Sequence, residues 1–347
     1  MASHADNVGG AGPGDGRAPG GARRWAWAAA WLGATALLVW IRPPLDLAAV
    51  PARLRAAEPR WIALALALNL AALALWTRQW RWLTPPALRA SWAAIAEVIS
   101  LSAAAMNTLP FPWGHSVGVG LLARRARFGW DAAVSVMALD QLCEGAAKLL
   151  LFLVAAWVAP LPGWIHRAAL ALSGGVLALF ATLALLAWLA RQARPGAGRL
   201  LRWARHLGAL RDPGALGGAL AMGVAIKCAQ AGAIYAAQRS LGIRLPVRDL
   251  APILAAVEVA TMIAVAPGGL AVYEAAAVVA YRYLGLAPGP ALAVALLQHA
   301  CFLLPMVLPG YGVTAWRALA GGGEGRGIPG GRPPAPSRPP GGRHGSR

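Results

Sequence analysis

The chain has 347 residues, of which 58% are hydrophobic and only 13% are charged, and its mean hydropathy is +0.55. A soluble protein carries about 25% charged residues, so the composition excludes an ordinary soluble domain and favours an all-α polytopic membrane protein. The net charge of +19 comes from arginines in loops and tails beside apolar segments, which indicates contact with anionic lipid and not with nucleic acid.

The N-terminal segment, residues 1–22, is rich in Gly, Ala and Pro and is predicted to be disordered. A first span is expected at 25–41, where four tryptophans favour a retained span over a cleaved signal peptide. A second span is expected at 61–76. It is followed by a basic aromatic sequence, Arg-Gln-Trp-Arg-Trp, that contains Arg78 and Arg81 and is typical of a membrane interface.

The apolar run at 91–109 ends in a break that contains Pro110, Pro112 and Gly114. Proline removes a backbone donor and glycine adds conformational freedom, so a helix is not expected to continue through this sequence. A shorter apolar piece at 117–123 follows, and after it a basic run that contains Arg124, Arg125 and Arg127.

The remaining uninterrupted spans are expected at 132–158, 167–190, 215–237 and 291–308. A strongly basic loop at 191–211 contains six arginines. The tail at 320–347 is composed largely of Gly, Pro and Arg and is predicted to be disordered. One integral membrane domain, residues 23–319, is therefore expected between two disordered tails.

A second interrupted segment at 250–283 contains the break Pro267, Gly268 and Gly269. Irregular backbone at membrane depth is tolerated only where protein buries it or where it lines a wet cavity. Glu274 follows by one turn, where the free N–H groups and the positive dipole end of a half-helix would lie. Interrupted helices of this kind form substrate and ion sites in many transporters.

The arginines favour one way of inserting the two interrupted segments. If each crossed the membrane once, the loop at 191–211 and the basic run at 124–127 would lie outside, against the positive-inside tendency. Two re-entrant helical hairpins that enter from opposite faces instead place both basic segments and both termini in the cytoplasm. We therefore expect six full spans plus two re-entrant hairpins in the cell membrane. Matching spacing after the two breaks, at 140–143 and 298–301, indicates an inverted repeat.

Asp140, Glu144 and Lys148 follow i, i+4, i+8 spacing and so share one helix face. A charge in the hydrocarbon costs at least about 2.5 kcal/mol, so these residues should face the bundle interior or water. They either line a path for a lipid headgroup or contain a Glu144–Lys148 pair that merely tolerates burial. Other central spans carry polar residues that together indicate a hydrated cavity: Lys227, Gln230, Glu258, Glu274, Gln298 and His299.

The sequence Gly-His-Ser-Val-Gly at 114–118 matches the G-x-S-x-G nucleophile motif, with Ser116 as the nucleophile. That motif requires a strand–turn–helix, and no strand pattern surrounds it here. We interpret it as a chance match and expect no enzymatic activity; a hydrolase that pairs Ser116 with His299 is the alternative. The three cysteines lack metal-binding spacing, and no P-loop or dinucleotide fingerprint occurs, so we expect no metal and no cofactor.

Three sequences resemble the membrane domain of lysylphosphatidylglycerol synthases, a flippase-like family. They are Arg-Gln-Trp-Arg-Trp-Leu at 78–83, Asn-Thr-Leu-Pro-Phe-Pro-Trp-Gly at 107–114, and Pro-Gly-Gly-Leu-Ala-Val-Tyr-Glu-Ala-Ala at 267–276. The resemblance covers residues 25–319. It implies lipid translocation or lipid binding, and it does not imply lysine transfer, because no soluble aminoacyltransferase domain is recognisable.

The chain departs from the family pattern at four positions. His115 and Gly118 stand where Glu and Arg are usual, Asp140 stands where an Arg is frequent, and Ala271 replaces a glycine. The headgroup contacts of this member are therefore expected to differ from those of its relatives.

The function expected is a lipid translocator or lipid-binding protein for an anionic phospholipid or a polyprenyl-phosphate-linked lipid. Its phosphate would meet the five arginines named above and then Lys148, with Glu258 and Glu274 acting on the opposite face; alternatively, the arginines only set topology. A different class of function is a membrane accessory or enzyme subunit in lipid-linked glycan or modified-lipid synthesis, acting with a partner glycosyltransferase.

Overall fold

The computed structural model describes residues 49–88, 90–109, 113–159, 163–192, 198–263 and 267–321. Within these ranges every regular element is a helix, and five helices are long and apolar enough to cross a bilayer. The expected all-α membrane class is therefore confirmed. The predicted span at 25–41, both predicted tails, and the break residues Pro110 and Pro112 lie outside the described residues.

Helices α3 (Pro59–Leu83) and α9 (Pro213–Ser240) pack against each other more extensively than any other pair. Each begins with a proline, whose missing N–H is not needed in the first turn. The carboxylate of Asp212 caps α9 by accepting hydrogen bonds from the N–H groups of Gly214 and Ala215. These two helices form one wall of the central cavity described below.

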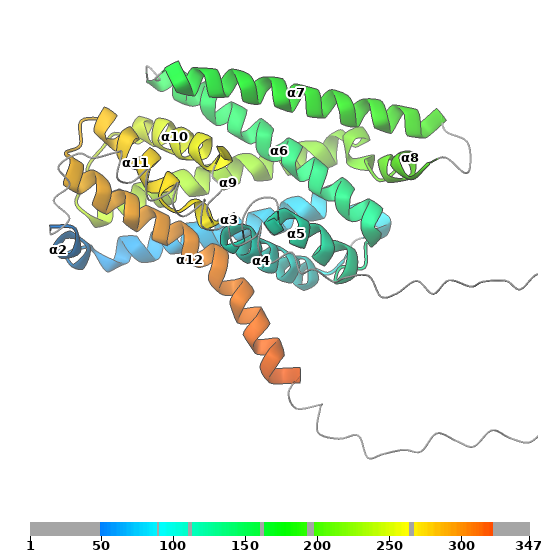
Figure 1. Ribbon diagram of the computed structural model, residues 1–347, viewed down its shortest axis with the longest axis horizontal. Helices are drawn as coiled ribbons and strands as arrows, with labels where there is room; N and C mark the ends of the chain where they lie inside the picture. The colour runs from blue at the N-terminus through cyan, green and yellow to red at the C-terminus, as the bar shows by residue number, and fades with distance from the viewer. Residues whose placement is uncertain are drawn as a thin grey trace, which may run out of the picture.

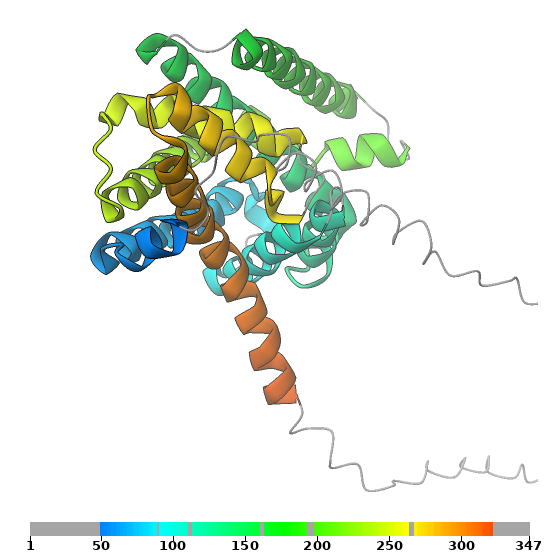
Figure 2. The ribbon, with the colours of Figure 1, turned by 60° about the vertical axis from the view of Figure 1, so that its left-hand side comes forward.

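Helices α6 (Gly129–Val158) and α7 (Gly163–Gln192) follow each other along the chain, and α7 lies on the outside of the bundle in both ribbon views (Figures 1 and 2). Gly145 allows α7 to approach α6, because a Cβ atom there would lie 2.6 Å from Cγ2 of Val176. The outer face of α7 exposes large apolar side chains, as expected for a surface in contact with lipid tails: Leu170, Leu177, Phe180, Leu185 and Trp188.

The first interrupted segment forms α4 (Trp92–Thr108) and α5 (Trp113–Arg124), which pack against each other. Ser91 caps α4 by accepting a hydrogen bond from the N–H of Ala94. Gly114 permits the contact between the two helices, because a Cβ atom there would lie 2.5 Å from the Cα of Met106.

The second interrupted segment forms α10 (Leu250–Ile263), the 3-10 turn η4 (Pro267–Gly269) and α11 (Val272–Tyr283). Gly268 and Gly269 have positive φ angles of 63° and 67°. Ala271 also has a positive φ, 69°. The break therefore needs the conformational freedom of glycine at two positions and strains an alanine at a third.

Helix α12 (Pro288–Gly321) is longer than the predicted span, and its C-terminal part extends away from the bundle (Figures 1 and 2). The predicted basic loop is partly helical, since it contains α8 (Arg199–Ala204) and η2 (Gly208–Arg211). Its apolar residues explain this difference: Ala204 and Leu207 are fully buried against the core. The other short elements are α2 (Ala49–Arg55), η1 (Pro86–Leu88) and η3 (Val247–Asp249).

The two interrupted segments occupy opposite ends of the bundle, with α4 and α5 towards one end and α10 and α11 towards the other (Figure 1). The end of α4 nevertheless lies close to the second break. A Cβ atom on Gly268 would lie 3.0 Å from the backbone oxygen of Asn107, which belongs to the last turn of α4. The tips of both segments therefore border the same internal space.

Candidate functional site

A cavity of about 360 Å³, lined by both polar and apolar side chains, lies between the two interrupted segments. The end of α4 contributes Asn107, the start of α5 contributes His115, and the break of the second segment contributes Gly268. A second cavity of about 230 Å³ shares Asn107 and His115 with the first and extends along α6 towards Asp140. Residues on either side of the first break, and the glycines of the second, thus line an internal cavity, the setting in which irregular backbone is tolerated.

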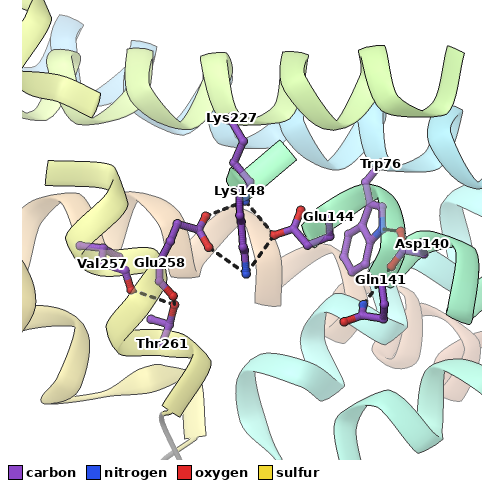
Figure 3. A network of polar contacts seen from close by, with 9 residues as sticks. All are labelled: Trp76, Asp140, Gln141, Glu144, Lys148, Lys227, Val257, Glu258 and Thr261. Atoms are coloured by element: carbon purple, nitrogen blue, oxygen red, sulfur yellow. Dashed lines mark hydrogen bonds and ion pairs between the residues drawn. The ribbon is translucent and has the colours of Figure 1, made fainter. Parts of the chain in front are cut away.

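Four charged side chains form a closed ring on the wall of this cavity (Figure 3). Nζ of Lys227 lies 2.6 Å from a carboxylate oxygen of Glu258 and 2.8 Å from one of Glu144. Nζ of Lys148 lies 3.0 Å from Glu258 and 3.2 Å from Glu144. Each ammonium therefore contacts both carboxylates, and the ring joins α6, α9 and α10.

The ring is mostly buried and carries no net charge. The side chain of Lys227 is 7% exposed and that of Glu258 10%, whereas Glu144 keeps 31% of its side-chain surface open. Buried ions are tolerated only when paired and hydrogen-bonded, and alternating charges satisfy that requirement. The open edge at Glu144 gives a polar ligand in the cavity a place to reach the ring.

Sequence spacing anticipated only part of this ring. The Glu144–Lys148 contact is present, but within a larger network that also includes Lys227 and Glu258. The sequence analysis grouped Glu258 with Glu274 on the face opposite Lys148. The structure instead places Glu258 against Lys148, because α10 packs on α6.

Asp140 lies one turn before Glu144 and has different partners (Figure 3). One of its carboxylate oxygens accepts hydrogen bonds from the indole N–H groups of Trp76, at 2.9 Å, and Trp80, at 2.8 Å. Trp80 is fully buried. Asp140 therefore fixes α6 to α3, and neither tryptophan was identified as a partner from the sequence.

His299 and Glu274 form a buried pair beside the second break. Nδ1 of His299 lies 2.7 Å from Oε1 of Glu274, and Nε2 lies 2.9 Å from the backbone oxygen of Gly268. The ring of Tyr273 stacks on the imidazole at a centroid distance of 4.1 Å. Glu274 thus lies in the first turn of α11 and is connected through His299 to the break itself.

Amide side chains supply much of the remaining polar lining. Asn69, Asn107, Gln230 and Gln298 line the larger cavity. Gln298 also accepts a hydrogen bond of 2.7 Å from Tyr281, whose hydroxyl accepts one of 3.2 Å from Gln238. Asn69 and Asn107 were not predicted to be site residues, although each is a polar residue inside an apolar segment and could have been identified on that ground.

Comparison with known proteins identifies the family to which this chain belongs. The sequence matches the lysylphosphatidylglycerol synthase TM region over residues 27–310. The chain belongs to this family. No curated protein matches it. The family and the apolar helices together establish a multi-pass membrane protein related to lipid handling, as the sequence resemblance predicted.

The arginines expected to bind phosphate lie outside the cavity of this family member. Arg78, Arg81 and Arg124 each lie over a tryptophan ring, at 5.7 Å from Trp82, Trp92 and Trp130 respectively. None of the five predicted arginines lines either cavity, although all five belong to the described residues. Arginine stacked on tryptophan at helix ends is typical of a membrane interface.

Glu97 neutralises one of these arginines. Its two carboxylate oxygens lie 2.6 Å from Arg125 and 2.6 Å from Arg317, which connects α4 to the turn that follows α5 and to α12. Glu97 was not predicted to be a site residue, even though it is an acid inside an apolar run. Helix α8 lies at this same end of the bundle, since Ser135, near the start of α6, donates a hydrogen bond to the carbonyl of Trp203.

Ser116 lies within helix α5 and not at a strand–turn–helix. His299, its hypothetical partner, contacts Glu274 and Gly268 through its two ring nitrogens. Among the described residues no group of three or more His, Cys, Asp or Glu side chains is arranged to hold a metal ion.

Proposed function

We propose that this protein translocates a phosphate-bearing lipid, and that the lipid headgroup crosses the bundle through the cavity between the two interrupted segments. The observation that carries this proposal is the ring of Lys148, Lys227, Glu144 and Glu258 on the walls of that cavity and of the smaller one beside it. Ionisable groups inside a membrane bundle mark substrate or ion pathways far more often than they serve packing.

The lysines define the headgroup chemistry that we propose. Among the described residues, Lys148 and Lys227 line the two cavities and no arginine does. An ammonium group is a common ligand of phosphate. The amides of Asn69, Asn107 and Gln230 are placed to hydrogen-bond hydroxyl groups beside that phosphate. These features support an anionic phospholipid or a polyprenyl-phosphate-linked lipid as the substrate.

The neutral charge of the ring favours passage over tight binding. A phosphate that contacts Lys227 must displace a carboxylate, and that carboxylate then competes to return. Glu144 is the carboxylate with the greater exposure, so we propose that it is the one displaced. A headgroup held by exchange with Glu144 can also leave.

We further propose that the protein lies in the cell membrane with six full spans and two re-entrant hairpins, which are related as an inverted repeat. In this arrangement both termini lie in the cytoplasm. Helices α5 and α11 have 12 residues each, which is about 18 Å of helix at about 1.5 Å per residue. The hydrocarbon core is about 30 Å thick, so neither helix is long enough to cross it alone.

Lipid translocation in liposomes tests the proposal. Purified full-length protein is reconstituted, and the transfer of fluorescent anionic phospholipid between leaflets is followed with a membrane-impermeant quencher. The double variant Glu144→Gln with Lys148→Met removes one positive and one negative charge from the ring and leaves the Lys227–Glu258 contact in place. We expect it to reduce the translocation rate about tenfold or more, as the loss of a charge-assisted phosphate contact implies.

A matched control removes an ion pair that lies outside both cavities. Glu58→Gln with Arg60→Gln abolishes an exposed pair at the start of α3 and should leave translocation unchanged. Equal rates for both double variants would contradict the proposed route. Absence of translocation by the unmodified protein would instead favour the second class of function, an accessory or enzyme subunit that acts with a glycosyltransferase.

A further inference from the structure

The imidazole of His299 has a hydrogen-bond acceptor at each nitrogen. The backbone oxygen of Gly268, 2.9 Å from Nε2, can only accept, so Nε2 must carry a hydrogen. Nδ1 lies 2.7 Å from Oε1 of Glu274, and that contact also needs a hydrogen between its two atoms. Either Nδ1 donates to an ionised carboxylate, or a protonated carboxyl donates to Nδ1.

Both arrangements contain one proton more than a neutral histidine beside an ionised glutamate. Without that proton, one of the two contacts would set a lone pair of His299 against a lone pair of an oxygen at less than 3 Å. Moving the single remaining hydrogen between Nδ1 and Nε2 only exchanges which contact is lost. The observed geometry therefore requires the extra proton.

The surroundings hold this pair away from water. The side chain of His299 is 3% exposed and that of Glu274 9%. Among the described residues, Oε2 of Glu274 is buried without a hydrogen-bond partner. Polar groups buried in this way depend on protein partners for their hydrogen bonds, so the state of the shared proton decides which contacts of the pair can form.

Other charged groups surround the pair at greater distance. Tyr273 of α11 stacks on the imidazole, and the adjoining cavity is lined by further titratable groups from other elements: Glu144 of α6, Glu258 of α10, Lys227 of α9 and His115 of α5. Helices α3 and α4 face this cavity with the neutral amides Asn69 and Asn107. Helix α2, which carries Arg53 and Arg55, packs against α12. Within the described residues, Glu274 is the carboxylate in contact with His299.

We propose that His299 and Glu274 form a proton-binding site, and that the shared proton latches the break between α10 and α11 to α12. Loss of the proton opens the contact with Gly268 or with Glu274 and releases the break, which forms one border of the cavity. This inference deepens the proposed function, because it makes the proton the species that controls the lipid path.

Two substitutions at Glu274 separate a proton latch from a purely structural contact. In Glu274→Gln the side-chain amide donates to Nδ1 while Nε2 still donates to Gly268, so this variant imitates the protonated pair without a proton to lose. In Glu274→Ala the partner of Nδ1 is absent, and the imidazole is no longer held in one orientation. A proton latch thus predicts opposite behaviour for two changes at one position.

The release of the break can be measured with a single cysteine. The three native cysteines are replaced by alanine, and Met262→Cys is introduced, since Met262 is half exposed, lies in the last turn of α10 and lines the cavity. The rate of reaction with a charged methanethiosulfonate is followed in proteoliposomes from about pH 5 to about pH 9, a range that spans histidine titration. Arg244→Cys, in an exposed loop, corrects for the intrinsic pH dependence of the thiol.

With Glu274 present, the corrected rate should rise about fivefold or more as the pH increases, the lower end of typical coupling between linked sites. Glu274→Gln should give a slow rate at every pH, and Glu274→Ala a fast one. A flat corrected rate with Glu274 present, or equal rates for the two variants, would overturn the proton latch.

Lipid transfer measured in the same liposomes keeps the two proposals separate. If labelling follows pH but no lipid moves, the proton site stands and the proposed function fails. If lipid moves while labelling is independent of pH, the proposed function stands and the latch is wrong.

Discussion

Lys227 connects two helices through a single ammonium group, with Nζ 2.6 Å from Glu258 on α10 and 2.8 Å from Glu144 on α6. Lys227 itself belongs to α9, so three helices meet at this atom. Its side chain is only 7% exposed, so water is poorly placed to replace the ammonium as a partner of the two carboxylates if the lysine is removed. Lys227 therefore holds the three helices together in addition to being a candidate ligand of the lipid phosphate.

Removal of Lys227 alone should destabilise the protein strongly. Lys227→Met leaves two carboxylates sharing one lysine, and loss of one member of a buried ion pair typically costs about 3–5 kcal/mol. The double variant Lys227→Met with Glu258→Gln removes the excess negative charge as well and should recover most of that loss. Thermal unfolding in detergent, followed by fluorescence-detected size-exclusion chromatography, provides the comparison. If the double variant is no more stable than the single one, the ring does not act as a balanced set of charges.

Asp140 offers a second test of a buried polar contact. Asp140→Ala leaves the indole N–H groups of Trp76 and Trp80 without their acceptor, at about 1–3 kcal/mol for each buried group. Asp140→Asn keeps a carbonyl oxygen in the same place and should remain close to the unmodified protein. Unfolding temperatures should therefore fall in the order Asp, Asn, Ala. An asparagine variant as unstable as the alanine variant would show that the negative charge, and not the acceptor, is required.

Much of the fold was predictable from local patterns in the sequence. Apolar length identified the spans, and proline followed by glycine located the second break, because both signals act within one segment. The shared face of Asp140, Glu144 and Lys148 followed from helical periodicity alone. Helix boundaries were predicted less well, and α12 in particular is longer than its apolar run.

The partners within the site were not predictable in the same way. The contact of Lys148 with Glu258 spans 110 positions of the chain and exists only because α10 packs on α6. The hydrogen bonds from the indole N–H groups of Trp76 and Trp80 to Asp140 likewise form only because α3 lies beside α6. No spacing rule within a single helix contains this information. The helices within the basic loop were not predicted, because the six arginines indicated an exposed segment, whereas Ala204 of α8 and the adjacent Leu207 are buried.

Close packing between α4 and α5 gives a third prediction. A Cβ atom at Gly114 would lie 2.5 Å from the Cα of Met106, so Gly114→Ala should force the two helices apart and cost about 1–3 kcal/mol. Gly120 lies on the same helix, where the nearest such atom is 3.9 Å away on Trp130. Gly120→Ala should therefore be neutral or slightly stabilising. Equal unfolding temperatures for the two variants would argue against the observed packing of α5 on α4.

The basic end of the bundle supports a fourth prediction, about lipid affinity. Arg124 and Arg127 are exposed, whereas the charge of Arg125 is offset by Glu97. Near an anionic surface each unpaired arginine contributes about 1 kcal/mol. Arg124→Gln with Arg127→Gln should reduce the enrichment of anionic lipid around the protein reconstituted in mixed-lipid nanodiscs, most clearly at low salt, and Arg125→Gln should have a smaller effect. If Arg125→Gln reduces this enrichment as much as the double variant, Glu97 does not neutralise it in the membrane.

The last prediction concerns Ala271, which has a φ of 69° and a ψ of −40° at the start of α11. Side chains with a Cβ atom are strained by about 1–2 kcal/mol in left-handed conformations, and glycine is not. Ala271→Gly should relieve this strain while losing one buried methyl group, worth about 0.8 kcal/mol.

Ala275→Gly is the matched control, since Ala275 is equally buried at 7% but lies inside α11 with helical geometry. There the same methyl is lost and glycine adds a penalty of about 0.5–1 kcal/mol. The lost methyl cancels between the two variants, so Ala271→Gly should be about 2 kcal/mol more stable than Ala275→Gly. A strained residue beside a latch that must open also has a functional meaning, because relief of strain favours the closed break. We therefore expect Ala271→Gly to translocate lipid more slowly than the unmodified protein despite its greater stability, and a faster variant would show that the strain does not assist opening.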